Sequence, residues 1–597
     1  MYGYAGRILE VDLKRRSINV LTLKESITRK LIGGRGLGTY LLLKMLPAGI
    51  DPLSGENVIV VASGPLNNTR IPMASKLGFF FKSPLTGGYG ESYVGGGIPR
   101  YPKASGYDAV IIKGSSQKPT YILISEDGVE FVDASELWGL TTIETDDILR
   151  RECGAGAGIA CIGPAGENMV RFACICVDKW RQAGRCGGGA VMGAKKLKAI
   201  VMVGKNETPV KSEEALGEML SVIMDKIKNS RGVKHMRKYG TSSMAALANE
   251  MGFFPTMYWR YGRLDGWEGI GPEAVRSILV SPKACWNCPV ACGRYVSVDT
   301  KWGKIEMDGP EYETIYAIGG LFGVRDIADL IYINYLADIY GIDTITLGNV
   351  LGFAVEASRR GKIPAIDFGD VEKAVELIKS IAYRNGVGSI LAEGVMRAAE
   401  RLGLSDIAIH VKGLEPAGYD PRVLKSMSLA YAVSPRGACH LRSMAYIIDI
   451  RKLAGDPDYM GEDKIRKIIE FEDWMTSFDC LILCKFGRDI FNLEIMWRLF
   501  TSVTGINISY SSYIGNLRTI LMIVRYFNER EGISGKYDVL PDRMFREQIT
   551  TKAGPRRISR EDFKIWLRKY YRLRGMLDDG SLSDENRRLV EELIHRE

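Results

Sequence analysis

The hydrophobic pattern of this 597-residue chain changes character near residue 208. Before that point, short runs rich in Val, Ile, Phe and Tyr are separated by Gly, Pro, Asp and Ser, as in NVIVVASG (57–64) and TYILISEDGVEFVDA (120–134). Such runs are typical of strands joined by turns, and EDG at 126–128 predicts a hairpin. After it, segments such as SEEALGEMLSVIMDKIKNS (212–230) space apolar residues as in helices.

This change predicts an α+β fold class with a β-rich front and a helical rear. Ser212 is the expected N-cap of the first long helix, and Gly386 the residue that ends the helix in VEKAVELIKSIAYRNG. The helical part is too long for one core. We therefore predict a β-rich domain over 1–208 and two mainly α-helical domains over 209–420 and 421–597.

Charge and cysteine content restrict the class of protein. The net charge of +9 is spread along the chain without a block of five like charges, so neither a nucleic-acid partner nor a membrane partner is expected. A mild positive field suits an acidic protein partner. No signal-peptide pattern and no apolar run of about 18 residues is present. An odd count of 11 cysteines favours metal ligation over disulfides, and we expect a cytoplasmic protein.

Three cysteines stand in the short stretch ACWNCPVACGRY, at Cys285, Cys288 and Cys292. A structural zinc ion and a cubane iron–sulfur cluster both need four ligands. No second Cys pair or His pair follows at zinc-ribbon spacing, which favours iron–sulfur over zinc. Cys484 is the candidate for a distant fourth ligand, and Cys480 is its competitor. Alternatively, both are buried free cysteines.

A glycine-rich stretch, RQAGRCGGGAVMGAKKLKAI (181–200), is flanked by basic residues. It is neither a Walker loop nor a dinucleotide fingerprint, and GGRGLGTY (33–40) is not one either. Its backbone and basic flanks are consistent with an anion cradle around a cofactor, and equally with a structural turn.

Two further segments carry candidate acid–base residues. In GPEYETIYAIGG (309–320), Glu311 and Glu313 precede an apolar run, so they either favour a helix dipole or include a buried carboxyl group with a raised pKa. In SPRGACHLRSMAY (434–446), His440 is either a structural residue or a proton carrier, and Arg442 can bind an anion.

One short pattern occurs twice. DIYGID spans Asp338 to Asp343, and DCLILC spans Asp479 to Cys484. In both segments an Asp precedes a ligand or hydrogen-bonding group by five residues. On spacing alone the two matches could arise by chance.

Together these segments resemble the tungsten-dependent aldehyde:ferredoxin oxidoreductase family along essentially the whole chain. The number and order of the matching blocks carry the resemblance. They are GRILEVDL, GGRGLGTYLL, FKSPLTGGYGESYVGG, GYDAVIIKG, AGRCGGGAVMGAKKLKAI, CWNCPVACGRY, GPEYET, LAEGV, KGLEPAGYDPR, RGACHLRS and YYRLRG.

The resemblance implies a set of cofactors and the residues that hold them. It implies two packed N-terminal sheets that form a saddle for a tungsten bis-pyranopterin (tungstopterin), without a protein ligand to tungsten, and Mg²⁺ bridging the pterin phosphates. It assigns a [4Fe–4S] cluster to Cys285, Cys288, Cys292 and Cys484. It assigns the contacts with the two pterins to Asp338, Asp343, Asp479 and Leu483, with Ile482 where the family has glycine.

Other positions carry over individually. Lys76 stands where the family often has an Arg between cluster and pterin. The carbonyl groups of Tyr93 and Ala183 correspond to those beside magnesium. Gly95, Gly184 and Arg185 belong to the phosphate cradle, Arg442 lies near a pterin, and Glu313 and His440 resemble the proton-handling pair.

The resemblance implies an enzyme that oxidises an aldehyde to a carboxylic acid and passes electrons to ferredoxin. It allows a homodimer, for which we expect no interface metal because the four histidines do not match the family's ligands. Two alternatives stay open. One is a tungsten-dependent reductase of an aromatic acyl-CoA type substrate, and the other is a zinc-structured binding protein.

Overall fold

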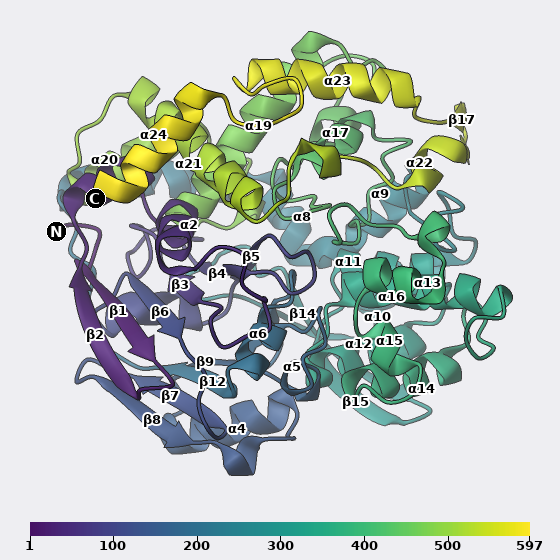
Figure 1. Ribbon diagram of the computed structural model, residues 1–597, viewed down its shortest axis with the longest axis horizontal. Coiled ribbons are helices and arrows are strands. Elements are labelled where there is room, and N and C mark those ends of the chain that lie inside the picture. Colours follow the sequence, from purple (N-terminus) through teal and green to yellow (C-terminus); the bar gives the residue numbers. More distant parts are fainter. Residues whose placement is uncertain (597) are drawn as a thin grey trace.

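The structure, a computed structural model, describes residues 1–596, with side chains through residue 594. Two six-stranded sheets occupy the N-terminal third (Figure 1). The first has the order β2-β1-β6-β3-β4-β5, and the second β11-β10-β9-β12-β7-β8. Their strands are β1 (Arg7–Asp12), β2 (Ser17–Thr22), β3 (Ile59–Ala62), β4 (Leu77–Lys82), β5 (Tyr89–Val94), β6 (Ala109–Lys113), β7 (Thr120–Ile124), β8 (Val129–Asp133), β9 (Gly158–Cys161), β10 (Ile175–Val177), β11 (Arg181–Ala183) and β12 (Leu197–Met202).

Local sequence explains several of these strands. The predicted hairpin at EDG is confirmed, because β7 and β8 pair antiparallel and the Ser125 amide donates to the Gly128 carbonyl over 2.9 Å. Strand β4 is buried along its whole length, since α2 packs against it. The helices of this region are α1 (Glu25–Leu31), α2 (Gly34–Met45), α3 (Tyr101–Ala104), α4 (Thr142–Cys153), α5 (Pro164–Glu167) and α6 (Gly188–Ala194).

The rest of the chain is mainly helical, so the predicted α+β class is confirmed. Figure 1 shows α12 to α16 on one side of the sheets and α19 to α24 above them. The helices are α7 (Glu213–Asn229), α8 (Arg231–Tyr239), α9 (Ser243–Met251), α10 (Pro272–Ser277), α11 (Tyr312–Thr314), α12 (Ile327–Tyr340), α13 (Thr344–Arg359), α14 (Val371–Ala382), α15 (Gly388–Leu391), α16 (Val395–Leu402), α17 (Lys425–Val433), α18 (Tyr446–Ile450), α19 (Glu462–Leu481), α20 (Leu493–Thr504), α21 (Tyr510–Arg530), α22 (Asp542–Arg546), α23 (Arg560–Leu573) and α24 (Asp584–Arg596).

The two predicted helix caps have different outcomes. Ser212 caps α7, because its hydroxyl accepts from the Ala215 amide over 3.1 Å. Gly386 as the end of α14 is wrong. Helix α14 ends at Ala382, and Arg384 takes the left-handed conformation (φ 52°). The end of the helix is a backbone capping turn around Arg384, closed by the Asn385 amide, which donates to the Ser380 carbonyl over 2.9 Å.

Strands inside the helical part were not predicted. β13 (Leu279–Lys283), β14 (Gly293–Thr300) and β15 (Gly303–Asp308) form an antiparallel sheet, and β16 (Ile549–Thr551) pairs with β17 (Gly554–Arg556). The connection from β13 to β14 carries the three neighbouring cysteines. The small sheet therefore anchors both ends of the cysteine loop.

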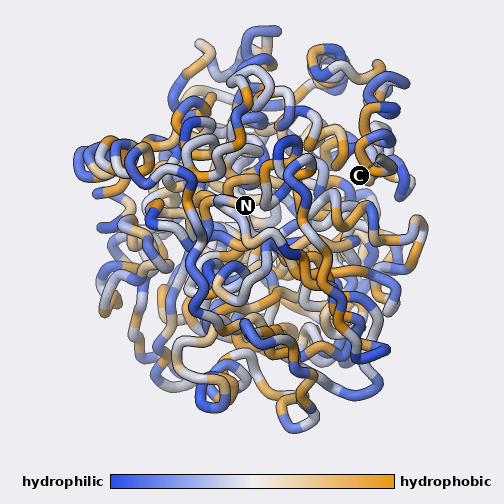
Figure 2. Tube along the Cα trace, turned by 90° about the vertical axis from the view of Figure 1, so that its left-hand side faces the viewer, coloured by the Kyte–Doolittle hydropathy of each residue, from blue (hydrophilic) through white to orange (hydrophobic). Residues whose placement is uncertain are grey.

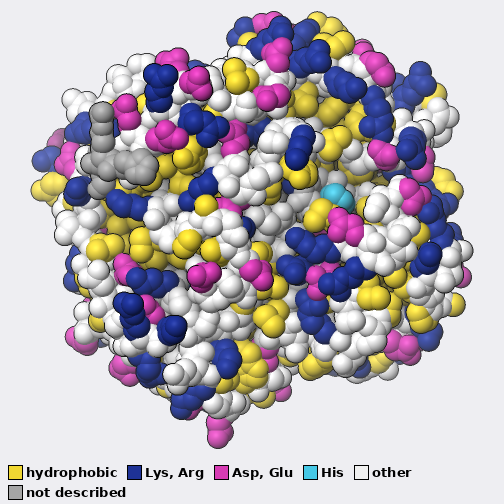
Figure 3. All heavy atoms as spheres, viewed as in Figure 1, with side chains coloured by type: hydrophobic (Ala, Val, Ile, Leu, Met, Phe, Trp, Pro, Cys, Tyr) yellow, Lys and Arg dark blue, Asp and Glu magenta, His cyan; other side chains and the backbone are white. Residues whose placement is uncertain are grey.

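The apolar segments lie mostly inside the molecule (Figure 2). One continuous hydrophobic core extends from Tyr4 to Leu593 and includes side chains of both the sheets and the helices. On the face in Figure 3, basic and acidic side chains are interspersed. Among the described helices, none combines the length and the apolar character required to cross a bilayer.

Candidate cofactor site and cysteine group

The structure brings Cys484 to the cysteine run, defined as Cys285, Cys288 and Cys292. Met73 joins the two segments, since its amide donates to the Asn287 carbonyl over 3.0 Å and its carbonyl accepts from the Cys484 amide over 2.9 Å. Cys480, the competing candidate, instead lies near Arg35 and the Gly36 backbone. Through Met73, therefore, Cys484 and not Cys480 lies next to the cysteine run.

The four thiols interact electrostatically. Burial raises the pKa of Cys288 to about 12, and the charge of Cys484 adds to the rise. Burial alone would lower the pKa of Lys76, but the neighbouring thiolates outweigh it and raise that pKa. Thiols crowded in this way fit a metal cluster, because metal binding compensates the charge of the thiolates.

Gly95 allows the close approach of β5 to the cysteine run. A Cβ atom on Gly95 would lie 2.6 Å from the Cys285 sulfur and 3.3 Å from the Lys76 nitrogen. Any side chain here would displace the sulfur, so the position requires glycine.

The cysteine group is not packed as the shell of a single ion. In the part of the chain that the structure describes, no three or more His, Cys, Asp or Glu side chains are arranged around one metal position. Zinc would hold thiolates about 2.3 Å from one centre, whereas a cubane distributes its ligands over several irons. The four cysteines are neighbours without forming a tight mononuclear site.

The edge strands of the two large sheets meet beside this group. β5 and β11 are in contact, and each is an edge strand of its sheet. Tyr93 lies on β5 and Ala183 on β11, and the Arg185 amide donates to the Ser92 hydroxyl over 3.2 Å. The Gly184 carbonyl accepts from the Cys174 thiol over 3.3 Å. The predicted magnesium and phosphate positions are therefore brought together.

The repeated sequence pattern corresponds to a repeated backbone. Helix α12 ends before Gly341 in the left-handed conformation, and α19 ends before Ile482 in the same conformation. Asp338 lies in the last turn of α12; its carboxyl group accepts from Gln182 over 3.0 Å, and burial raises its pKa to about 8. Leu483 is buried, and its amide donates to the Phe478 carbonyl over 3.0 Å.

Each half of the pattern is paired with an arginine. Arg185 contacts Asp343 with 2.8 Å between Nε and Oδ2, and it also donates to the Glu415 carbonyl over 2.7 Å. Arg442 contacts Asp479 over 2.9 Å and Glu91 over 2.6 Å. Both arginines are buried, so both halves place a guanidinium group inside the protein.

Four buried arginines, Arg35, Arg185, Arg436 and Arg442, lie among buried carboxyl groups. Burial would raise the pKa of Glu91, but Arg35, Arg442 and Arg436 lower it to about 2. Burial raises the pKa of Glu415 to about 7, so this carboxyl group carries less negative charge. Buried cations are stable only with anionic partners, and the Nε atoms of Arg436 and Arg442 have no hydrogen-bond partner among the described residues, which fits a ligand with phosphate groups.

Glu313 and His440 face each other at this site. Their Oε1 and Nε2 atoms are 3.5 Å apart, and the Gly418 amide donates to Glu313 Oε2 over 3.0 Å. Burial raises the pKa of Glu313 to about 8. Burial, together with nearby Arg436, lowers the pKa of His440 well below its ordinary value. At neutral pH the pair is thus mainly a neutral acid next to a neutral imidazole.

Tyrosines hold this pair in position. The hydroxyl groups of Tyr316, Tyr431 and Tyr312 donate to the consecutive carbonyls of Pro416, Ala417 and Gly418, over 2.5, 2.9 and 2.5 Å. These bonds fix the backbone that presents the Gly418 amide to Glu313. On the other side, Tyr419 stacks on the His440 ring with 5.4 Å between centroids.

Several buried polar atoms at the site have no hydrogen-bond partner within the described residues. Such atoms are rare in folded proteins and indicate a missing ligand, ion or water. Together with the close approach at Gly95 and the group of buried arginines, they show that the side chains fit a large polar, anionic cofactor. They include Glu313 Oε1, His440 Nδ1, Arg442 Nε, Arg436 Nε, Ser443 Oγ, Ser75 Oγ and Gln182 Oε1.

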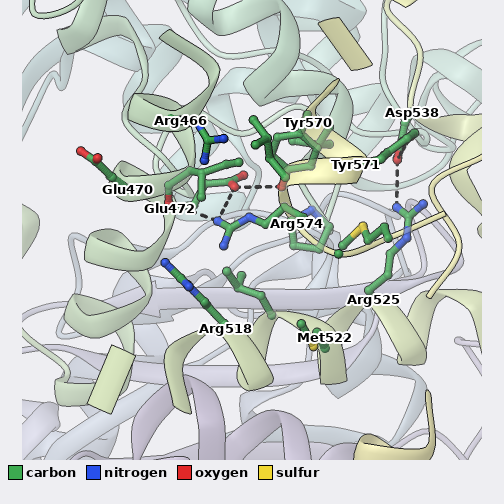
Figure 4. A pocket seen from close by; sticks show the side chains of 17 residues that line it. Arg466, Glu470, Glu472, Arg518, Met522, Arg525, Asp538, Tyr570, Tyr571 and Arg574 are labelled. Carbon is green, nitrogen blue, oxygen red and sulfur yellow. Dashed lines mark hydrogen bonds and ion pairs between the residues drawn. The ribbon is translucent and has the colours of Figure 1, made fainter. Parts of the chain in front are cut away.

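A cavity of about 430 Å³ lies elsewhere, between α19, α21 and α23 (Figure 4). Its charged lining is largely paired, since Arg574 bonds Glu472 over 2.6 Å and Tyr571 bonds Asp538 over 2.6 Å. None of the residues predicted from sequence lines this cavity.

Sequence reasoning missed part of the site. Glu91 joins Arg35 and Arg442, and the tyrosines fix Gly418, yet neither was a candidate. Glu91 lies within GESYV, a block already quoted for the family resemblance, so that block held the signal. No sequence signal marked the tyrosines, because the carbonyl group that each hydroxyl contacts is known only from the folded structure.

Comparisons with known proteins agree with this arrangement. A family model described as "Aldehyde ferredoxin oxidoreductase, N-terminal domain" matches residues 8–204, and one described as "Aldehyde ferredoxin oxidoreductase, domains 2 & 3" matches residues 218–589. A tungsten-containing aldehyde ferredoxin oxidoreductase from Pyrococcus furiosus is 35% identical, over 98% of each chain. These matches define an oxidoreductase. The chain belongs to the tungsten-containing aldehyde ferredoxin oxidoreductase family.

Other relatives have different names. The WOR-like subunit of an aliphatic sulfonate oxidoreductase from P. furiosus is 29% identical, over 99% of this chain and 97% of the relative. The solved structure titled "Active site complex BamBC of Benzoyl Coenzyme A reductase in complex with 1,5 Dienoyl-CoA" superimposes with a TM-score of 0.85 at 23% identity. It covers 100% of this chain and 99% of that one, and shows that the two share a fold.

Proposed function

We propose that this chain oxidises an aldehyde to a carboxylic acid with a tungsten bis-pyranopterin and passes the electrons through a [4Fe–4S] cluster to ferredoxin in the cytoplasm. The observation that carries the proposal is the buried Glu313–His440 pair. Its two unpartnered atoms, Glu313 Oε1 and His440 Nδ1, lie among buried arginines. That combination suits a reaction in which protons are removed beside an anionic cofactor.

The residues proposed to hold each group combine the family assignments with the contacts described above. Cys285, Cys288, Cys292 and Cys484 would ligate the cluster, next to Lys76. Arg185 and Arg442 would neutralise phosphate groups, because both are buried and Arg442 Nε has no hydrogen-bond partner among the described residues. Pterin contacts are assigned to Asp338, Asp343, Asp479 and Leu483, and Mg²⁺ would bind the carbonyls of Tyr93 and Ala183.

When bound, the tungsten cofactor supplies two-electron redox chemistry and the cluster divides it into single-electron steps. Conversion of an aldehyde and water to a carboxylic acid releases two electrons and two protons. Glu313, once ionised, is the base that receives a proton at Oε1, and His440 Nε2, 3.5 Å away, is placed to pass it on. The Gly418 amide holds Oε2, which keeps Oε1 directed toward the reaction.

Substitution of Glu313 tests this assignment. Glu313→Gln keeps an acceptor for the Gly418 amide but removes the base, so kcat should fall by about 10²–10⁴-fold. Activity would be measured anaerobically with a panel of aldehydes and a viologen dye, alongside tungsten and iron content. A variant with normal metal content and wild-type kcat would refute the role of Glu313. Full activity in protein grown without tungsten would refute the proposed function.

The pH profile gives an independent test. Because the base acts when ionised and burial raises the pKa of Glu313 to about 8, kcat/KM of the wild type should rise with pH up to about 8 and then level off. Glu313→Gln removes this ionisation, so its residual activity should lack that rise. The same rise in the variant would assign the ionisation to another group.

The shared fold with the benzoyl-CoA reductase complex favours a second candidate, a tungsten-dependent reductase of an aromatic acyl-CoA type substrate. Aldehyde oxidation by the purified lone chain would support the first function over this one. A zinc-structured binding protein is the third, and absorption near 400 nm from an iron–sulfur chromophore would exclude it.

A further inference from the structure

We infer that helix α8 and the adjoining cysteine loop form the docking surface for an acidic ferredoxin, an inference that rests on the proposed electron transfer. Helix α8 has the sequence RGVKHMRKY, with four basic residues and no acidic residue in nine positions. Its exposed basic side chains are Arg231, Lys234, Arg237 and Lys238.

Helix α8 is fixed directly to the cysteine run. Arg237 donates to the Pro289 carbonyl, within the loop that carries the cysteines. Arg294 donates to the carbonyls of Arg237 over 2.9 Å, Lys238 over 3.1 Å and Ala291 over 2.6 Å. One guanidinium group thus joins the C-terminal end of the helix to the loop and fixes the basic face beside the cysteines.

The loop itself reaches the surface. Lys283, Ala284 and Asn287 are exposed, and Cys285 is half-buried. A cluster held here would lie close to solvent on this side, and electron transfer requires the two carriers to approach closely. The exposed loop next to α8 therefore offers a short path between a cluster and a docked protein.

The charges of α8 are free to meet a partner. No ion pair with a described residue engages any of its four basic side chains, whereas some exposed arginines on other helices are paired, such as Arg466 with Glu462 and Arg498 with Glu494. The nearest acids are already engaged, because Asp489 pairs with Arg451 over 3.3 Å and Glu311 lies 3.9 Å from Arg181. An unpaired basic face attracts an acidic protein and raises its association rate.

A double charge reversal, Lys234→Glu with Lys238→Glu, tests this surface without altering the cysteines. With a purified acidic [4Fe–4S] ferredoxin as acceptor, kcat/KM for ferredoxin should fall about tenfold or more at low salt. The rate with viologen should stay unchanged, because a small dye does not need the docking surface. High salt should lower the wild-type value toward that of the variant.

The matched control is Lys564→Glu with Lys569→Glu, which makes the same change in net charge on exposed positions of α23. It should keep wild-type kinetics with ferredoxin. An equal loss in both double variants, or no loss in the α8 variant, would overturn the assignment of the surface.

Calorimetric binding of the same ferredoxin separates this inference from the proposed function. The wild type should bind it and the α8 variant should bind at least about tenfold more weakly, whether or not an aldehyde is oxidised. Equal affinity of the two proteins would overturn the docking surface, while absence of aldehyde oxidation would overturn only the proposed function.

Discussion

The segments that end α12 and α19 share one backbone plan but have different residues at its left-handed position and at its capping position. In each, an Asp lies in the last turn, the third residue after it is left-handed, and the fifth caps the next helical segment. The first copy uses Gly341 and Asp343, the second Ile482 and Cys484. The left-handed position shows which residues the backbone conformation accepts, and the capping position shows which side chain the function of each copy needs.

The left-handed position shows what the backbone requires. Gly341 adopts φ 76° and ψ 54° without strain, but Ile482 adopts φ 60° and ψ 36° with a β-branched side chain, which is an unfavourable conformation. The fully buried Ile482 side chain packs toward Gly34 and Gly64, and this burial offsets the strain. The surrounding structure therefore imposes the turn even where the sequence does not favour it.

The capping position shows what the chemistry requires. Asp343 accepts from the Ile345 amide over 3.0 Å and pairs with Arg185, so it serves both helix α13 and the buried cation. Cys484 occupies the equivalent position but joins the cysteine run through Met73. The same turn thus places a carboxylate that pairs with Arg185 in the first copy and a candidate metal ligand, Cys484, in the second.

The largest expected effect comes from changing the thiol of the second copy. Cys484→Ser should remove a cluster ligand, so iron content and absorption near 400 nm fall and aldehyde oxidation drops more than about 100-fold, beyond the usual effect of residues outside the ligand shell. Cys480→Ser is the control, since Cys480 lies away from the run. Normal iron in Cys484→Ser, or a selective loss in Cys480→Ser, would contradict the assignment.

The two aspartates paired with arginine should differ in their effect on stability. Asp343→Ala leaves the buried Arg185 without its carboxylate and should cost about 3–5 kcal/mol. After Asp479→Ala, Arg442 keeps Glu91 at 2.6 Å. Lys485 loses its carboxylate partner at 2.8 Å, but burial lowers the pKa of Lys485 to about 7, so it can release its proton. The loss should therefore be about 1–2 kcal/mol. Urea unfolding midpoints of the two variants would measure the difference. Equal losses would mean that Glu91 and the release of a proton from Lys485 do not compensate for the missing carboxylate.

The contrast between the two copies also shows what sequence can predict. Cys484 could be proposed from its family position, and the structure brings it to the run. The left-handed turn at Ile482 could not be read from its residue type, because isoleucine disfavours it. The Glu91–Arg442 pair and the small sheet around the cysteines depend on contacts between distant segments, which neither periodicity nor local propensity contains.

The smallest expected effect isolates the strain of the turn itself. In a left-handed position glycine is favoured over alanine by about 1 kcal/mol, whereas within a helix alanine is favoured by a similar amount. Gly341→Ala should therefore destabilise the protein by about 1 kcal/mol. At the second copy, Ile482→Ala and Ile482→Gly both lose the buried side chain, but the glycine variant should be the more stable of the two.

The pair Ser221→Ala and Ser221→Gly supplies the reference, because Ser221 is exposed within α7 and alanine should be the more stable variant there. Urea unfolding of these five variants and the wild type would show at each position whether glycine or alanine is the more stable. If alanine were also favoured at 482, the second copy would not share the left-handed turn of the first. The opposite signs at 482 and 221 would instead show that the backbone repeats even though its glycine does not.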